Sequence, residues 1–152
     1  MTTYVLDTNV FNKVVEGVFD RSSLPADSSF VVSHVQIEEL NNTSDKERRL
    51  QLLLTLAQLR PTLVPAESMI WDVSRWDHAK WGDGAIYTQV KTGLDALNKG
   101  KAKNIQDALI GEIGIVNGHT LLTADKDLAA VVQSLNGLVE FVSPKALTAT
   151  VR

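Results

Sequence analysis

Short apolar segments alternate along this chain with longer stretches of helical periodicity. Five segments rich in Val, Leu and Thr have the length and composition of strands buried on both faces, at residues 4–6, 30–33, 62–64, 120–123 and 139–142. This alternation predicts strand–helix–strand units around a parallel sheet. Because crossovers between parallel strands are right-handed, we expect an α/β fold, a three-layer α/β/α sandwich with a short parallel sheet of four or five strands.

The stretches between the strands carry apolar residues at helical spacing. Ser44-Asp45-Lys46-Glu47 has the spacing of a capping box, and the predicted buried face that follows consists of Leu50, Leu53, Leu54 and Ala57. A helix near the end of the chain is predicted to begin at about Asn104 and to end at Asn117-Gly118, with these positions inward: Ile105, Leu109, Ile113 and Val116. Two further helices are predicted, one from about residue 67 toward 78 and one spaced by Ile86, Val90, Leu94 and Leu97.

Length and composition exclude several classes of protein. A chain of 152 residues forms one core by default, so we expect a single domain over residues 1–152. The absence of cysteine excludes a thiol nucleophile, an iron–sulfur cluster and a thiolate zinc site. We expect a cytoplasmic protein, because the sequence contains no cysteine, no secretory signal and no apolar run of membrane-spanning length. The net charge of −3 excludes a broad basic surface, so any contact with nucleic acid must be local.

Acidic residues follow several of the predicted strands. Asp7 comes directly after the first strand, Glu39 lies about one and a half turns into the next helix, and Asp107 occupies the first turn of a later helix. Asp125 and Asp127 follow the strand at 120–123. Since ligands of parallel sheets bind beyond the carboxyl ends of the strands, these acids are predicted to share one edge.

Crowded carboxylates repel one another, and a bound divalent cation relieves that repulsion. Oxygen ligands suit Mg²⁺ or Mn²⁺, which can support hydrolysis of a phosphodiester. Helix capping is an alternative explanation for Asp7, Asp107 and Asp125 taken singly, and a cap formed by Ser33 and Gln36 would leave Glu39 merely exposed. The joint placement of the acids favours the functional interpretation. Three residues could support the carboxylates or simply mark strand ends: Thr8, Asn9 and Thr123.

Four segments resemble the motifs of the PIN-domain nucleases, in particular the toxin nucleases of VapBC-type toxin-antitoxin pairs. They are Val-Leu-Asp-Thr-Asn at 5–9, residues 33–40, Asp-Ala-Leu-Ile at 107–110 and residues 122–128, and the resemblance spans nearly the whole chain. It implies metal-binding and catalytic roles for Asp7, Glu39, Asp107 and Asp125, with Asp127 as an additional or substitute acid. It also implies an Mg²⁺- or Mn²⁺-dependent ribonuclease, a small antitoxin protein as partner, and a homodimer. Leu128 departs from the motif, because an aromatic residue is frequent there.

Other polar and aromatic residues are weaker candidates. Trp81 and the neighbouring Lys80, in or near a predicted loop, are candidate contacts for RNA or a partner. Trp71 and Trp76 are expected to pack inside. The basic clusters are read as solvated surface in preference to binding sites: Lys46, Arg48 and Arg49, then Lys99, Lys101 and Lys103. The histidines show no metal-ligand spacing and are expected at the surface or at caps: His34, His78 and His119.

Competing functions were weighed on the same residues. A haloacid-dehalogenase-type phosphatase needs a second aspartate where this chain has Asn9, and no G-x-G-x-x-G motif follows the first strand to bind a dinucleotide. Two alternatives stay open. One is a catalytically weak PIN-like scaffold that binds a protein partner, and the other is a housekeeping RNA-processing nuclease.

Overall fold

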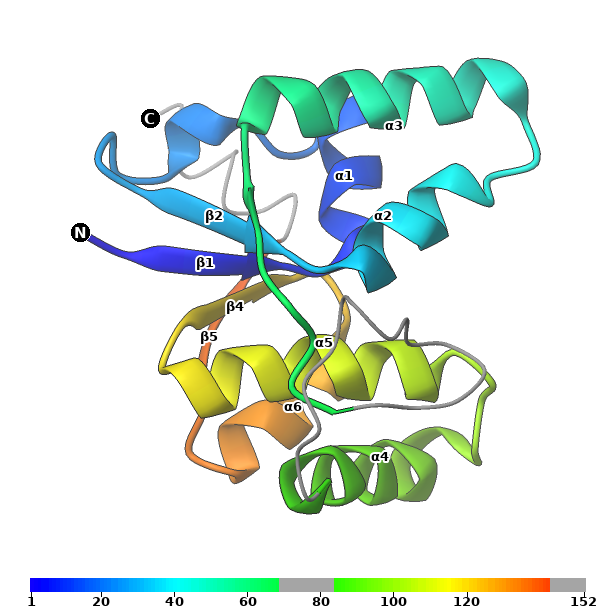
Figure 1. Ribbon diagram of the computed structural model, residues 1–152, viewed down its shortest axis with the longest axis vertical. Coiled ribbons are helices and arrows are strands. Elements are labelled where there is room, and N and C mark those ends of the chain that lie inside the picture. Colours follow the sequence, from blue (N-terminus) through cyan, green and yellow to red (C-terminus); the bar gives the residue numbers. More distant parts are fainter. Residues whose placement is uncertain (69–83, 143–152) are drawn as a thin grey trace.

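A parallel sheet of five strands forms the centre of the molecule (Figure 1), with the strand order β3-β2-β1-β4-β5. The computed structural model describes residues 1–68 and 84–142. The strands are β1 Thr3–Leu6, β2 Ser29–Val32, β3 Thr62–Leu63, β4 Thr120–Thr123 and β5 Leu138–Phe141. Every predicted strand is therefore confirmed to within one residue at each end.

Helices cover both faces of this sheet, as the predicted three-layer sandwich requires (Figure 1). They are α1 Thr8–Val15, α2 His34–Asn41, α3 Lys46–Leu59, α4 Ala85–Asn98, α5 Asn104–Asn117 and α6 Lys126–Ser134, with a short 3-10 turn at Arg21–Ser23. Successive strand residues point to opposite layers. Tyr4 and Leu6 pack in the same cluster as Phe11 of α1, whereas Val5 packs in the cluster that contains Leu109 of α5. The sheet therefore separates two apolar cores.

Helix α3 buries a different face from the predicted one. Leu52 and Thr55 are buried, whereas Leu50 and Leu54 are 58% and 54% exposed. The N-cap is Asp45 in place of Ser44, because its Oδ1 accepts hydrogen bonds from the backbone N–H groups of residues 47 and 48 at 3.0 and 3.3 Å. A helix this rich in leucine offers two overlapping apolar stripes, and packing against α1 selects one of them.

The helices on the other face agree with the predictions along most of their length. Gly118 ends α5 with φ +68°, the left-handed conformation that was predicted there. The last inward position of α5 is wrong, since Val116 is 49% exposed. It is the next-to-last residue of the helix.

Several predictions fall outside the described residues. They concern the helix from 67 toward 78, beyond its first two residues, together with Trp71, Trp76, His78, Lys80 and Trp81. Of the other histidines, His34 is the first residue of α2 and is 4% exposed, so the surface position is wrong for it, and the side-chain cap of this helix comes from Ser33. Among the described residues, no helix has the length and apolarity needed to cross a membrane.

Candidate functional site

Asp7 lies at the end of β1 and is completely buried. It occupies the N-cap position of α1 but makes no capping hydrogen bond with its side chain, so the capping explanation is wrong for this residue. Its Oδ2 accepts a 2.6 Å hydrogen bond from Thr123 Oγ1, while Oδ1 is buried and accepts none among the described residues. Burial raises the pKa of Asp7, although the charge of Lys103 and the Thr123 hydrogen bond oppose that shift.

Asp107 lies in the first turn of α5 and is 3% exposed. It does not act as a cap, because the N-cap position belongs to Lys103 and no side chain caps this helix. Burial is the largest cause that raises the pKa of Asp107 to about 8, followed by the negative charge of Asp7, and Lys103 opposes both. The charges of Glu39 and Asp125 raise it further. These four acids therefore act on one another electrostatically, as their predicted common edge requires.

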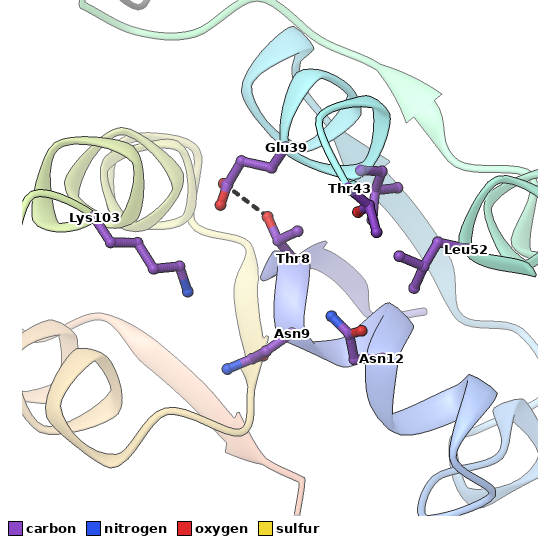
Figure 2. Close-up of a pocket in the computed structure, with 8 residues that line it drawn as sticks. Thr8, Asn9, Asn12, Glu39, Thr43, Leu52 and Lys103 are labelled. Atoms are coloured by element: carbon purple, nitrogen blue, oxygen red, sulfur yellow. Dashed lines mark hydrogen bonds between the residues drawn. The ribbon is translucent and has the colours of Figure 1, made fainter. Parts of the chain in front are cut away.

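Glu39 reaches the same edge from α2. Ser33 and Gln36 form the capping box of this helix, and Gln36 Nε2 donates a 3.1 Å hydrogen bond to the carbonyl of Leu6, which ties α2 to the end of β1. Glu39 is not merely exposed, since it is half-buried and its Oε1 accepts a 2.9 Å hydrogen bond from Thr8 Oγ1 (Figure 2). Burial raises the pKa of Glu39, and the bond from Thr8 lowers it.

Asp125 does cap a helix. Its Oδ1 accepts hydrogen bonds from the backbone N–H groups of Asp127 and Leu128 at 2.9 and 3.2 Å at the start of α6. Its negative charge nevertheless raises the pKa of Asp7 and Asp107, so capping and membership of the acidic edge coexist. Asp127 is tied to this edge, in the part of the chain described here, only through its backbone N–H.

The three predicted supporting residues lie beside the acids. Thr123 Oγ1 donates to Asp7 and accepts from the backbone N–H of Asp125 at 2.9 Å, so one hydroxyl connects two of the carboxylate residues. Thr8 donates to Glu39, and Asn9 Oδ1 accepts a 3.2 Å bond from the N–H of Ala124 after β4. Their functional roles remain predictions.

Lys103, which the sequence interpretation placed on the solvated surface, lies instead beside the acids of the site. Its ammonium lies 3.5 Å from Asp107 Oδ1, and its side chain is 46% exposed. Burial acts to lower the pKa of Lys103, but attraction to Asp107, and then to Asp7, Glu39 and Asp125, outweighs burial and raises it. The spacing of four residues between Lys103 and Asp107 on a helix was the available signal.

The acids of this edge offer oxygen atoms as ligands for a divalent cation. Within residues 1–68 and 84–142, no three acidic or histidine side chains converge closely enough to hold an ion in this conformation. The groups available are nonetheless all oxygen donors, which suit Mg²⁺ or Mn²⁺. Asp7 Oδ1 is buried and accepts no hydrogen bond among the described residues, and Asp107 Oδ1 accepts none there either, although the Lys103 ammonium lies 3.5 Å from it. A bound cation would satisfy both oxygens. The chemistry of the donors therefore fits the ion.

A cavity of about 210 Å³, here called the side pocket, opens next to these acids (Figure 2). Residues of the acidic edge border it on one side: Thr8, Asn9, Glu39 and Lys103. The rest of its wall comes from α1, α2, α3 and the turn between the last two: Asn12, Leu40, Thr43 and Leu52. A group bound at the acids could therefore extend into the side pocket.

Comparisons with known proteins identify the fold. No protein-family model matches the sequence, and no curated protein sequence matches it. A domain of a functionally unknown protein from Methanocaldococcus jannaschii is 14% identical, with a TM-score of 0.55 over 94% of this chain and 92% of that one. VapBC2 from Rickettsia felis, solved bound to a DNA fragment from its promoter, is 17% identical, with a TM-score of 0.54 over 92% and 98%. The chain shares the fold of these proteins, which confirms the predicted resemblance at the level of the fold.

Proposed function

We propose that this chain is a metal-dependent endoribonuclease that hydrolyses phosphodiester bonds in RNA. The observation that carries the proposal is the pair of buried carboxylates Asp7 and Asp107, each with an oxygen that accepts no hydrogen bond among the described residues. They come from the end of β1 and the start of α5. The charge of Asp125 raises the pKa of both carboxylates, and the charge of Glu39 raises the pKa of Asp107. The fold shared with VapBC2 supports the proposal.

Four acids would hold the ion, Mg²⁺ or Mn²⁺: Asp7, Glu39, Asp107 and Asp125. When bound, such an ion lowers the pKa of a water molecule and stabilises negative charge on the phosphate. Asp7 Oδ1 and Asp107 Oδ1, which accept no hydrogen bond among the described residues, would be ligands of this ion. Asp127 would take part only as an additional acid, because its present contact is through the backbone.

The chain's own hydroxyl groups orient these carboxylates. Thr123 fixes Asp7, and Thr8 fixes Glu39, through bonds of 2.6 and 2.9 Å. Donors of this kind hold a ligating oxygen in one orientation and affect the affinity of a site strongly. The Asp125 cap has a similar effect, since the backbone N–H groups at the start of α6 hold its Oδ1 in place and Oδ2 would bind the ion.

Lys103 supplies positive charge at the same edge. Without a cation it offsets the repulsion between the acids, because its ammonium lies 3.5 Å from Asp107 Oδ1. With RNA bound, an ammonium beside the acids can donate hydrogen bonds to phosphate oxygens. Its long, half-exposed side chain permits both positions.

A protein partner belongs to the same proposal. VapBC2, which shares this fold, was solved with promoter DNA. For this chain we propose a small antitoxin protein as a partner that covers the acidic edge. We also propose that the chain forms a homodimer and works in the cytoplasm. An adjacent gene that encodes a short DNA-binding protein would support the toxin-antitoxin assignment, and its absence would favour the housekeeping nuclease.

One observation favours the alternative of a scaffold without catalysis. Lys103 already lies among the acids, and no three acidic or histidine groups of the described residues converge on one point. A domain in which this ion pair served only stability would have the same arrangement. A measurement of RNA cleavage distinguishes such a scaffold from a nuclease.

The test is cleavage of a mixed-sequence RNA with Mg²⁺, with Mn²⁺ and with a chelator. We expect cleavage that depends on the metal and is lost in Asp7→Asn and in Asp107→Asn. Asp27→Asn is the matched control, because Asp27 is 65% exposed in a loop and pairs with the N-terminus. Folded protein that cleaves no RNA and binds no metal would contradict the proposal and make the scaffold the better account.

A further inference from the structure

The wall of the side pocket contains an asparagine whose amide is held in one orientation. Asn12 Oδ1 accepts hydrogen bonds from Arg48 Nε at 3.2 Å and from Arg48 Nη2 at 2.8 Å. A guanidinium group can only donate, so the atom facing Arg48 must be the amide oxygen. Glu16 fixes Arg48 in turn through a 2.9 Å ion pair. The NH₂ group of Asn12 is therefore directed away from Arg48, and Figure 2 shows it on the side of Thr8.

A second amide is fixed in the same way. Asn9 Oδ1 accepts from the backbone N–H of Ala124 at 3.2 Å, so its NH₂ group is also a free donor among the described residues. The Thr8 hydroxyl, in contrast, is already donated to Glu39. Both asparagines line the side pocket, but Figure 2 shows the Asn9 amide directed toward the side of Lys103 and away from Leu52. The NH₂ group of Asn12 is therefore the donor offered to an acceptor bound in the uncharged part of the pocket.

The other properties of the side pocket limit the size and charge of its occupant. Its volume of about 210 Å³ is below the roughly 300–1,000 Å³ of sites for drug-sized ligands, which suits a single ring system. Leu40 and Leu52 contribute apolar wall. The charged residues of the lining, Glu39 and Lys103, belong to the acidic edge. The rest of the wall, from Asn12, Leu40, Thr43 and Leu52, is uncharged, and Arg48 is engaged by Asn12 and Glu16, so this part suits a neutral group better than a phosphate. A flat, neutral group with carbonyl oxygens satisfies all of these features.

We propose that the side pocket binds one nucleobase of the RNA, next to the phosphate at the acidic edge, and selects bases with carbonyl oxygens. This inference rests on the proposed function, because the base in the pocket belongs to the same RNA strand whose phosphate lies at the acids. Asn12 donates to the carbonyl oxygen of a base held on the side of the pocket that Leu40 and Leu52 line. Uracil, with two carbonyl groups, fits this pattern, and adenine, with none, does not.

Binding of three labelled single strands of equal length tests the proposal: oligouridylate, oligoadenylate and an abasic ribose-phosphate oligomer. Fluorescence anisotropy is measured in Ca²⁺, and gels verify that the strands stay intact. We expect oligouridylate to bind roughly three- to tenfold more tightly than oligoadenylate, the range that one hydrogen bond supplies. The abasic oligomer should bind most weakly.

The decisive variant is Asn12→Asp. It keeps the size of the side chain and an oxygen for Arg48, but it replaces the NH₂ donor with an acceptor. The preference for oligouridylate should disappear or reverse. Asn41→Asp is the matched control, since it adds the same charge at the exposed end of α2 and should leave the ratio unchanged. Circular dichroism of both variants checks the fold.

The outcomes separate this inference from the proposed function. Equal affinity for the three strands, or an unchanged ratio in Asn12→Asp, would overturn the base pocket, even if metal-dependent cleavage were found. A base preference that depends on Asn12 would support the pocket, even if cleavage were absent.

Discussion

At the scale of single residues, three aspartates at neighbouring ends of strands and helices have different roles. Asp125 uses one oxygen to cap α6, whereas Asp7 and Asp107 cap nothing and each keep a buried oxygen that accepts no hydrogen bond within the described part of the chain. All three positions look alike in the sequence, because each follows a strand or opens a helix. The difference depends on which N–H groups happen to be within reach after folding.

The pH dependence of stability should reveal Asp107. Because its pKa is raised to about 8, the folded state keeps a proton that the unfolded chain loses near the ordinary pKa of an aspartate. The unfolded state therefore binds fewer protons in this window, and the metal-free protein should lose stability as the pH rises from about 4 to about 8. Denaturant titrations with a chelator would measure this loss.

Asp107→Asn is the comparison for that titration. An amide cannot ionise, so the slope of the unfolding free energy against pH should become flatter in this window. An unchanged slope would contradict a buried, protonated Asp107. Asp27→Asn, at an exposed position, should keep the original slope.

Thr123 should control metal affinity without being a ligand. Its hydroxyl holds Asp7 Oδ2 at 2.6 Å, and loss of such a bond typically weakens a metal site about 10- to 100-fold. We expect Thr123→Val to lower the affinity for Mn²⁺ by this factor in calorimetric titrations. Thr123→Ser keeps the hydroxyl and should stay within a few-fold of the unmodified protein, and equal losses in both variants would point to packing instead.

At the scale of elements, α3 shows where sequence patterns fail. Its position was predicted, but its cap and buried face were each wrong, because Ser44 and Asp45 are both good caps and the leucines form more than one stripe. Strands were easier to predict. A strand buried on both faces needs only a short apolar run, and no choice of face remains.

The cap of α3 can be tested directly. Asp45→Ala should destabilise the protein by about 1 kcal/mol, because two backbone N–H groups lose their acceptor. Ser44→Ala is the matched control and should change the unfolding free energy by less than about 0.5 kcal/mol. Chemical denaturation of both variants measures the difference, and a larger loss in Ser44→Ala would restore the capping box that the sequence suggested.

At the scale of the whole molecule, the sheet order brings the site together. β1 lies between β2 and β4, so the acids that follow these strands meet at one edge although Asp7 and Thr123 are 116 positions apart. The topology followed from the alternation of segments, and so did the common edge for the acids. The positions of Lys103 and of the Asn12–Arg48 pair did not follow, since side-chain contacts between distant segments depend on packing that no local pattern records.

The net charge of −3 predicts that the affinity for RNA depends only weakly on salt concentration. Because no broad basic surface is available, few phosphates should be neutralised when RNA binds. Each contributes roughly −0.7 to the slope of log K against log salt for a single strand, so we expect a slope no steeper than about −2. Anisotropy titrations of oligouridylate at several salt concentrations test this. A much steeper slope would show an extended basic contact.

The central claim is that the acids at the end of the sheet form one site for a divalent cation. Direct titration of the metal-free protein with Mn²⁺, followed by electron paramagnetic resonance, tests it without reference to any substrate. We predict saturable binding that is lost in the Asp7→Asn, Asp107→Asn double variant while its circular dichroism stays unchanged. Mn²⁺ binding of equal affinity in the folded double variant, or no binding by the unmodified protein, would contradict the claim.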